Sequence, residues 1–508
     1  MTALSPLERR AQTIERLEKE TFDLLVVGAG IIGSRVAYEA ACRGLRVALV
    51  DAGDFGGGTS SASSKLIHGG LRYLAGYDFG LVHEALAERH ALLTRVAPHL
   101  VHRLQFLLPL YRGGPWSPLT IGAGLVLYSA LSAFRDGRVR LVTPAGARGI
   151  VTPLRDDGLR AAGVFSDAQT DDVRLCLATV TAASRAGAAV LNHAAVVGID
   201  RPAVRSASLR VRGGPDVTIR CRQIVNAAGP WVDEVRRLED ASARPLVRLS
   251  KGVHLTVPLP EAFESALIVP VDRTRVTFAI PWQGLLLLGT TDTPYDGDPT
   301  ALAVEPADVR TVLAEAGLAL PSRLLDPRHI RFSFAGLRAL PLGERGTAQA
   351  SREHLVEVSR AGMISVAGGK LTTHRRIALD VLRRLPAEVL RGPRPRTPDD
   401  HPLPGGVTAS RAGPSAVDPV TRHLAGIYGS EADRVLACAA SDRTAMERIH
   451  PEGPDLWAQA RYAIQEEWAA TVDDLVRRRT SLSVRGLADE QVRRRLHDLL
   501  ASAGALLP

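Results

Sequence analysis

The clearest chemical signal in the chain is a glycine-rich turn near its start. Gly28-Ala-Gly30-Ile-Ile-Gly33 follows an apolar stretch, 23–27, and precedes a segment with helical periodicity. In such a turn the first glycine bends the chain, the second lets the backbone approach a pyrophosphate, and the third lets helix and strand pack closely. Asp51 ends the next apolar stretch, where its carboxylate can bind the hydroxyls of a ribose. The spacing predicts a dinucleotide-binding site and leaves FAD and NAD open.

A second segment, 56–73, follows soon after Asp51 and combines small residues with hydroxyl, lysine, histidine and arginine side chains. Small residues let a chain pass close to an extended pyrophosphate and ring system, although Gly/Ser segments also form flexible surface loops. Its position favours a cofactor-binding loop.

The whole-chain charge gives little support to a nucleic-acid partner. The formal net charge is +9 and aromatic residues make up 5% of the chain. The basic residues are almost all arginines, and they are scattered instead of forming one long basic run. RNA recognition would need a concentrated basic face with stacking aromatic side chains. We therefore predict no nucleic-acid binding.

The cysteines and the apolar segments limit the other classes of protein. The four cysteines are far apart, without a Cys-x-x-Cys pair, which argues against a disulfide framework, a zinc site and an iron–sulfur cluster, so no metal site is predicted. The N-terminus lacks the apolar core of a signal peptide. The longest apolar segment, 121–134, is shorter than the about 20 residues that span a bilayer. It favours a buried helix, with contact to a membrane surface as the alternative.

The elements around these residues alternate between strand and helix patterns, which predicts an α/β protein. We expect a Rossmann-like nucleotide-binding domain made of 21–98, 151–245 and 330–385. An antiparallel-sheet cap domain for the substrate is expected at 99–150 and 246–329, because 250–295 is rich in β-branched and aromatic residues. A proline-rich linker, 386–418, leads to a helical C-terminal domain, 419–508.

Residues 59–74, ThrSerSerAlaSerSerLysLeuIleHisGlyGlyLeuArgTyrLeu, resemble the signature of the FAD-dependent (aerobic-type) glycerol-3-phosphate dehydrogenases. This family belongs to the D-amino-acid-oxidase-like flavoproteins. Further segments resemble the family in the same order, and together they extend over about 22–482. They are 226–233, 250–254, 278–282, 289–293, 336–338, 368–373 and 469–480. Two positions depart from the family pattern: Ala339 replaces a usual proline, and His374 replaces a usual tyrosine.

The resemblance implies FAD as the cofactor. The residues that it assigns to FAD, with Lys65 serving either the pyrophosphate or packing, are Gly28, Gly30, Ile32, Gly33, Asp51, Thr59, Ser60, Ser61, Ser64, Lys65, Leu66, His68, Gly69, Gly70, Ala227, Gly229, Trp231, Gly336, Arg338, Gly369, Lys370, Leu371 and Thr372.

The resemblance also implies oxidation of sn-glycerol 3-phosphate to dihydroxyacetone phosphate by hydride transfer to the flavin. Arginine suits the phosphate because its guanidinium makes two parallel charge-assisted hydrogen bonds. Arg72 and Arg338 are the predicted anchors, with Tyr73 and Lys370 beside them. Imidazole titrates near neutral pH, so His68 and His254 are unranked candidates for the base, and His254 also for substrate contact. Arg338 and Lys370 complete the predicted catalytic set.

For the electron acceptor the family implies a membrane quinone, reached by a cytoplasmic protein bound peripherally to the inner membrane. A related branch uses oxygen. The runner-up function is a flavin oxidase or dehydrogenase for another small anion, such as an amino or hydroxy acid, since paired arginines also bind carboxylates. A homodimer is a possible assembly. A flavoprotein acting on RNA is disfavoured by the scattered arginines and the few aromatic residues. A cofactor-bound module without catalysis would leave Arg72, Arg338 and Lys370 without a purpose.

Overall fold

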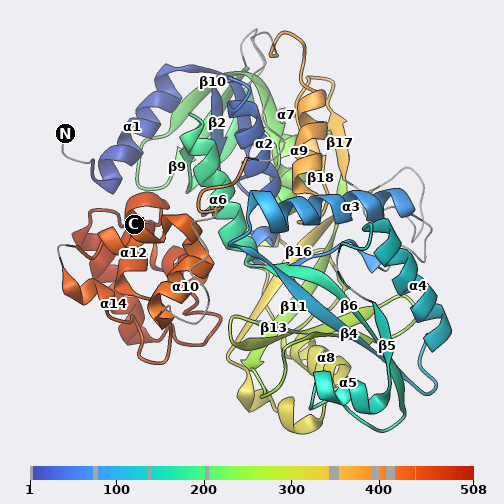
Figure 1. Ribbon diagram of the computed structural model, residues 1–508. Coiled ribbons are helices and arrows are strands. Elements are labelled where there is room, and N and C mark those ends of the chain that lie inside the picture. Colours follow the sequence, from blue (N-terminus) through green and yellow to red (C-terminus); the bar gives the residue numbers. More distant parts are fainter. Residues whose placement is uncertain are drawn as a thin grey trace.

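The computed structural model describes residues 4–71, 78–135, 137, 139–200, 205–342, 354–390, 401–407, 418–440 and 442–507. Figure 1 shows two lobes, each built on a sheet, and a separate group of helices formed by the C-terminal part of the chain. This arrangement confirms the predicted α/β class with a second, largely antiparallel sheet and a helical C-terminal unit.

The first sheet has a parallel centre in the order β18-β10-β1-β2-β7, extended by antiparallel β17 and by the β8–β9 pair. Its central strands are apolar and buried on both faces, as expected for parallel strands covered by helices. Helices α2, α6 and α9 pack together near one face, and α1 contacts β7 and β10. The bounds are β1 (Thr21–Val27), β2 (Val47–Val50), β7 (Ala189–Leu191), β8 (Ala194–Asp200), β9 (Arg205–Val211), β10 (Val217–Asn226), β17 (Leu355–Val358), β18 (Ile364–Ala367), α1 (Pro6–Lys19), α2 (Ile31–Ala41), α6 (Asp172–Arg185), α7 (Val232–Glu239) and α9 (His374–Arg383).

The second sheet follows the order β15-β11-β14-β13-β12-β4-β6-β3, with β16 beside β11 and β5 beside β6. Every pair in it is antiparallel except β12–β4. The bounds are β3 (Leu66–Ile67), β4 (Val101–Tyr111), β5 (Arg140–Val142), β6 (Leu159–Thr170), β11 (Val247–Pro258), β12 (Ala266–Pro270), β13 (Val276–Trp282), β14 (Leu285–Gly289), β15 (Thr293–Tyr295) and β16 (Phe332–Pro341).

Three strands of the second sheet, β3, β6 and β16, come from ranges that the sequence placed in the nucleotide-binding part. The reason is visible in the pairing: β6 runs antiparallel along the whole of β4, and β16 runs along most of β11. Together with the β3–β6 pair, these long pairings place all three strands in the second sheet. The periodicity of a strand does not reveal which sheet it joins.

The helices of the second lobe include one correction. They are α3 (Phe79–Ala91), α4 (Pro118–Leu131), α5 (Pro144–Ile150) and α8 (Pro306–Ala316). The segment 121–134 forms most of α4 and the turn after it, and several of its apolar side chains are exposed. The prediction of a buried helix is therefore wrong. Leu125 and Tyr128 are buried against the sheet, whereas Val126 and Phe134 are 56% and 66% exposed. The high mean hydropathy of this segment predicted burial, but hydropathy alone does not show which side of a helix faces the solvent.

The C-terminal unit packs around its own apolar core and lies beside α1 and α6 (Figure 1). Its helices are α10 (Pro419–Tyr428), α11 (Ala432–Ala437), α12 (Trp457–Glu466), α13 (Val472–Asp474) and α14 (Glu490–Ser502). Buried contacts fix it to the first lobe. Arg174 on α6 makes a bidentate ion pair with Glu467, with N···O distances of 2.9 and 2.6 Å.

Candidate active site

A large cavity of about 1490 Å³ lies where the two sheets and the C-terminal unit meet. Its wall combines the turn after β1, the ends of β10 and β16, part of β11, and the segments 51–68, 366–372 and 471–478. A cavity assembled from so many distant segments is the natural place to look for ligand binding.

The glycine-rich turn forms one part of this wall, and its geometry explains the glycines. Gly28 has a φ of +96°, and a Cβ atom there would lie 2.6 Å from the Ala227 carbonyl oxygen. A Cβ atom on Gly33 would lie 1.9 Å from the Gly28 carbonyl oxygen, so α2 packs directly against the turn. Gly30 caps α2 and lines the cavity with Ile32. The turn thus presents bare backbone and a helix N-terminus to the cavity, as a pyrophosphate requires.

Asp51 lies beside the turn and is held by the backbone. Its carboxylate accepts hydrogen bonds from the Ala29 and Gly53 N–H groups at 2.7 and 2.9 Å. Burial raises its pKa to about 6 against the opposing effect of these two bonds. Ser60, from the predicted cofactor loop, accepts the Ile31 N–H at 2.9 Å. The loop, the turn and the acid therefore form one continuous surface that fits an adenosine diphosphate.

Arg338 lies elsewhere on the wall, on β16, and is held by several partners. Its Nη2 donates to Thr290 Oγ1 at 3.0 Å and to the Thr291 carbonyl at 3.2 Å, and its Nη1 lies 3.3 Å from Asp292 Oδ1. Gly252 on β11 leaves space for it, since a Cβ atom there would lie 2.7 Å from Nη2. The guanidinium lines the cavity, and the side chain is 34% exposed.

His254 lies on β11 near Arg338. Its Nε2 is 2.9 Å from Ser64 Oγ, and its ring stacks on Phe334 at 5.1 Å between centroids. Burial, with smaller effects from the Arg338 and Lys65 charges, lowers its pKa to about 3. The imidazole is therefore neutral at pH 7.

His68, the other candidate base, lines the same cavity and is fixed by its backbone. The His68 N–H donates to Thr372 Oγ1 at 3.0 Å, and the Thr372 hydroxyl donates to the His68 carbonyl at 3.2 Å. Lys370 and Leu371 line the cavity beside them. The structure thus brings the 66–68 segment and the 368–372 loop together across more than 300 residues.

Most of the predicted FAD residues line the cavity, but five do not: Gly33, Ser61, Lys65, Gly69 and Gly70. Gly33 acts through helix packing, as described above. The Lys65 ammonium is buried, donates to the Ser61 carbonyl at 2.8 Å, and pairs with Asp172 at 2.6 Å. This agrees with packing, the second of the two roles given to Lys65. Arg72 and Tyr73 lie outside the described residues.

The two departures from the family pattern differ in position. Ala339 lines the cavity from β16, where it pairs with Leu249. His374 is buried at the start of α9, with its Nδ1 2.7 Å from the Leu371 carbonyl oxygen, and burial lowers its pKa to about 4. It supports the 368–372 loop from behind and does not line the cavity.

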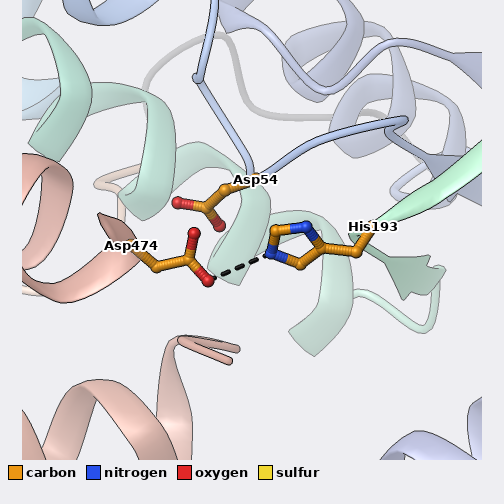
Figure 2. A group of neighbouring side chains, drawn as sticks. All are labelled: Asp54, His193 and Asp474. Carbon is orange, nitrogen blue, oxygen red and sulfur yellow. Dashed lines mark hydrogen bonds and ion pairs between the residues drawn. The ribbon is translucent and has the colours of Figure 1, made fainter. Parts of the chain in front are cut away.

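Part of the wall comes from residues that the sequence motifs do not indicate. Asp54, His193, Asp474 and Arg478 also line the cavity, and Figure 2 shows the first three converging. Asp474 and Arg478 come from the C-terminal unit, for which the sequence motifs indicate no role in cofactor binding. The Arg477-Arg478-Arg479 run was the available signal, but nothing in the sequence indicates its partner, more than 420 residues away.

Comparisons with known proteins agree with this arrangement. Residues 23–375 match a family described as FAD dependent oxidoreductase, and residues 398–503 match the C-terminal domain of alpha-glycerophosphate oxidase. A glycerol-3-phosphate dehydrogenase of Mycobacterium leprae is 37% identical, over 95% of this chain and 84% of the relative. The aerobic glycerol-3-phosphate dehydrogenase of Escherichia coli K12 is 33% identical, over 93% and 96%.

Solved structures give the same picture. The glycerol-3-phosphate dehydrogenase from Bacillus halodurans, complexed with FAD, aligns with a TM-score of 0.77 and 28% identity, over 98% of this chain and 97% of that one. An L-alpha-glycerophosphate oxidase from Mycoplasma pneumoniae with FAD bound aligns with a TM-score of 0.59 and 19% identity, over 76% and 99%, which is a likeness of fold alone.

Proposed function

Because the chain belongs to the family of FAD-dependent glycerol-3-phosphate dehydrogenases, we propose that it oxidises sn-glycerol 3-phosphate to dihydroxyacetone phosphate and passes the electrons to a membrane quinone. The observation that carries the substrate assignment is the placement of Arg338. Its guanidinium lies at the wall of the cavity that fits FAD, within a scaffold of carbonyl and hydroxyl acceptors. A fixed arginine is suited to a phosphate dianion.

The chemistry divides between the cofactor and the protein. When bound, FAD supplies the acceptor for the hydride that leaves C2. Arg338 binds the phosphate and thereby orients the C2 hydroxyl. His68 and His254 both line the cavity, and either imidazole, in its neutral form, can accept the hydroxyl proton as the carbonyl forms. Binding of the phosphate would neutralise the Arg338 charge, which is one cause of the low His254 pKa, and would make His254 more basic.

An anaerobic titration tests the substrate. Adding glycerol 3-phosphate to the holoenzyme should bleach the flavin absorbance within the mixing time of a steady-state assay. Glycerol, which lacks the phosphate, is the matched control and should leave the flavin oxidised. Bleaching by an amino or hydroxy acid, with none by glycerol 3-phosphate, would contradict the proposal.

A peripheral membrane contact is supported by the outer side of α4. The helix carries no charged residue, and its exposed side chains Leu119 and Val126 are 84% and 56% exposed. The chain from 101 to 150 contains six arginines and one acid. An apolar helix face within a basic segment is the pattern of a protein that lies on an anionic lipid surface. Among the described residues, no helix is long and apolar enough to cross a bilayer.

The inner side of the same helix contacts the segment that contains His68, which lines the cavity. Tyr128 on α4 accepts the Gly69 N–H at 2.9 Å and donates to Asp167 at 2.8 Å. A membrane bound to α4 would therefore lie against the element that supports the 66–70 segment, which favours a quinone as acceptor.

Vesicle sedimentation tests this contact. Val126→Ser combined with Phe134→Ser should reduce binding to phosphatidylglycerol vesicles, whereas the matched change Leu318→Ser, at an exposed apolar residue elsewhere, should not. Equal binding of all three proteins would contradict the role given to α4.

Oxygen is the second candidate acceptor, favoured by the match of residues 398–503 to the C-terminal domain of alpha-glycerophosphate oxidase. The two acceptors are separated by following peroxide formation and quinone reduction during turnover. Stoichiometric peroxide in the presence of a soluble quinone would favour oxygen.

A further inference from the structure

A buried ionic network joins the segment after Asp51 to the C-terminal unit, and Figure 2 shows three of its side chains, Asp54, His193 and Asp474. Arg479 donates from both Nη atoms to the two carboxylate oxygens of Asp54, each at 2.8 Å. Arg478 bridges Asp54 and Asp474, with its Nη2 2.9 Å from Asp474 Oδ1. The other oxygen of Asp474 lies 3.0 Å from His193 Nε2. We call these five residues the interlobe network.

The interlobe network is complete without a metal ion. Asp54, His193 and Asp474 could offer three ligand atoms within 4.8 Å of one another. However, both oxygens of Asp54 already accept from guanidinium groups, and Asp474 also accepts from two backbone N–H groups near the start of α13. Two arginines neutralise the two carboxylates, so a divalent cation would meet two positive charges. The donor set indicates an ion-pair cluster.

The backbone connects this network directly to the predicted ribose acid. The Ala194 N–H donates to the Asp51 carbonyl at 2.7 Å, and the His193 N–H donates to the Gly53 carbonyl at 2.8 Å. Asp54 follows Gly53 in the chain, and four of the five network side chains line the large cavity. The network therefore holds the backbone around Asp51 in two ways, through the segment at His193 and through Asp54.

The ion pairs of the interlobe network are strong because they are buried. Although burial opposes ionisation, the Arg479 and Arg478 charges hold the pKa of Asp54 below its ordinary value. Asp54 and Arg479 have no exposed side-chain surface. Removing one member would leave an uncompensated buried charge, so the network keeps the segment and the C-terminal unit in one arrangement. A ligand that binds a fixed arrangement loses less free energy to ordering of its site.

We propose that the C-terminal helical unit is part of the FAD site, and that the interlobe network positions the segment bearing Asp51. The affinity for FAD then depends on the contacts of the interlobe network with this segment, and not on every contact that holds the C-terminal unit in place. Because coupling between two equilibria is reciprocal, FAD must in turn stabilise the contacts of the network. The proposal rests on FAD binding, and not on the identity of the substrate or the electron acceptor.

The test measures FAD release from the holoenzyme after dilution, by the fluorescence of free flavin and without substrate. Arg478→Gln and, separately, Asp474→Asn should raise the FAD dissociation constant roughly 10- to 100-fold, the effect of losing a buried charged hydrogen bond. The matched control is Arg174→Gln, which breaks another buried ion pair between the first lobe and the C-terminal unit. Arg174 lies outside the wall of the large cavity, and its replacement should leave FAD affinity unchanged.

Hydrogen exchange supplies the reciprocal measurement. FAD should slow exchange of the amides of α12 and α14 in the wild-type protein and in Arg174→Gln, and should have a smaller effect in Arg478→Gln.

Unchanged FAD affinity in both Arg478→Gln and Asp474→Asn would overturn the proposal. It would also be overturned if Arg174→Gln released FAD as readily, because any loosening of the unit would then suffice.

Discussion

Ser64 Oγ and His254 Nε2 lie 2.9 Å apart, although 190 positions separate the two residues in the chain. Ser64 belongs to the loop that follows the glycine-rich turn, and His254 to β11 of the second sheet. Both residues line the cavity, and the contact holds the imidazole by one nitrogen. Because the ring is buried and neutral, its titration should be visible in the stability of the protein.

We expect the free energy of unfolding to depend on pH through His254. The unfolded chain binds a proton at this imidazole below its ordinary pKa of 6.5, whereas the native state binds it only near 3. Between these values the unfolded state holds more protons, so stability falls as the pH falls, by about 1.4 kcal/mol per pH unit. His254→Asn should remove this contribution and flatten the dependence measured by urea unfolding between pH 4 and 6.5. His497→Asn, at an exposed histidine, is the control, and an identical slope in all three proteins would exclude the effect.

Much of the fold and of the FAD site could be predicted because each part has a local signature. The turn at Gly28 needs a φ of +96°, and Gly33 needs the absence of a Cβ atom, so glycine spacing alone identifies them. The partners of Arg338 could not be predicted in this way. Asp292 and Thr290 reach it only because β11 lies between β15 and β16 for part of its length, and this pairing is set by the whole sheet. The interlobe network is hidden for the same reason.

Arg338→Ala should weaken substrate binding and leave the flavin in place. Loss of a charged hydrogen-bonding partner predicts a KM for glycerol 3-phosphate that is roughly 10- to 100-fold higher. The visible spectrum of the purified protein should match that of the wild type, since the FAD phosphates are assigned to another part of the wall. Arg328→Ala, at a surface arginine that pairs with Asp326, is the matched control. If KM stayed at the wild-type value, the phosphate anchor would lie elsewhere.

Gly33→Ala should yield a protein with little bound flavin. The new methyl group would lie 1.9 Å from the Gly28 carbonyl oxygen, so α2 must move away from the turn that cradles the pyrophosphate. The ratio of flavin to protein absorbance after purification measures this. Gly80→Ala places a methyl group on α3 with no atom within 4 Å and should retain full flavin content. A fully loaded Gly33→Ala protein would refute close helix packing as the reason for this glycine.

Lys65 gives the final prediction, because its two possible roles have opposite consequences. Its ammonium is 2.6 Å from Asp172, and both side chains are buried, so Lys65→Met leaves an unpaired carboxylate at the start of α6. That should lower the free energy of unfolding by about 3–5 kcal/mol. Replacing Asp172 with Asn in the same protein removes the unpaired charge and should recover part of the lost free energy of unfolding. The control is Lys19→Met, at an exposed lysine, which should change the free energy of unfolding little. If Lys65 served the pyrophosphate instead, Lys65→Met would weaken FAD binding while stability of the FAD-free protein stayed constant, and the second replacement would restore nothing. Urea unfolding of the three variants without FAD distinguishes the two roles, and the ion pair predicts the first outcome.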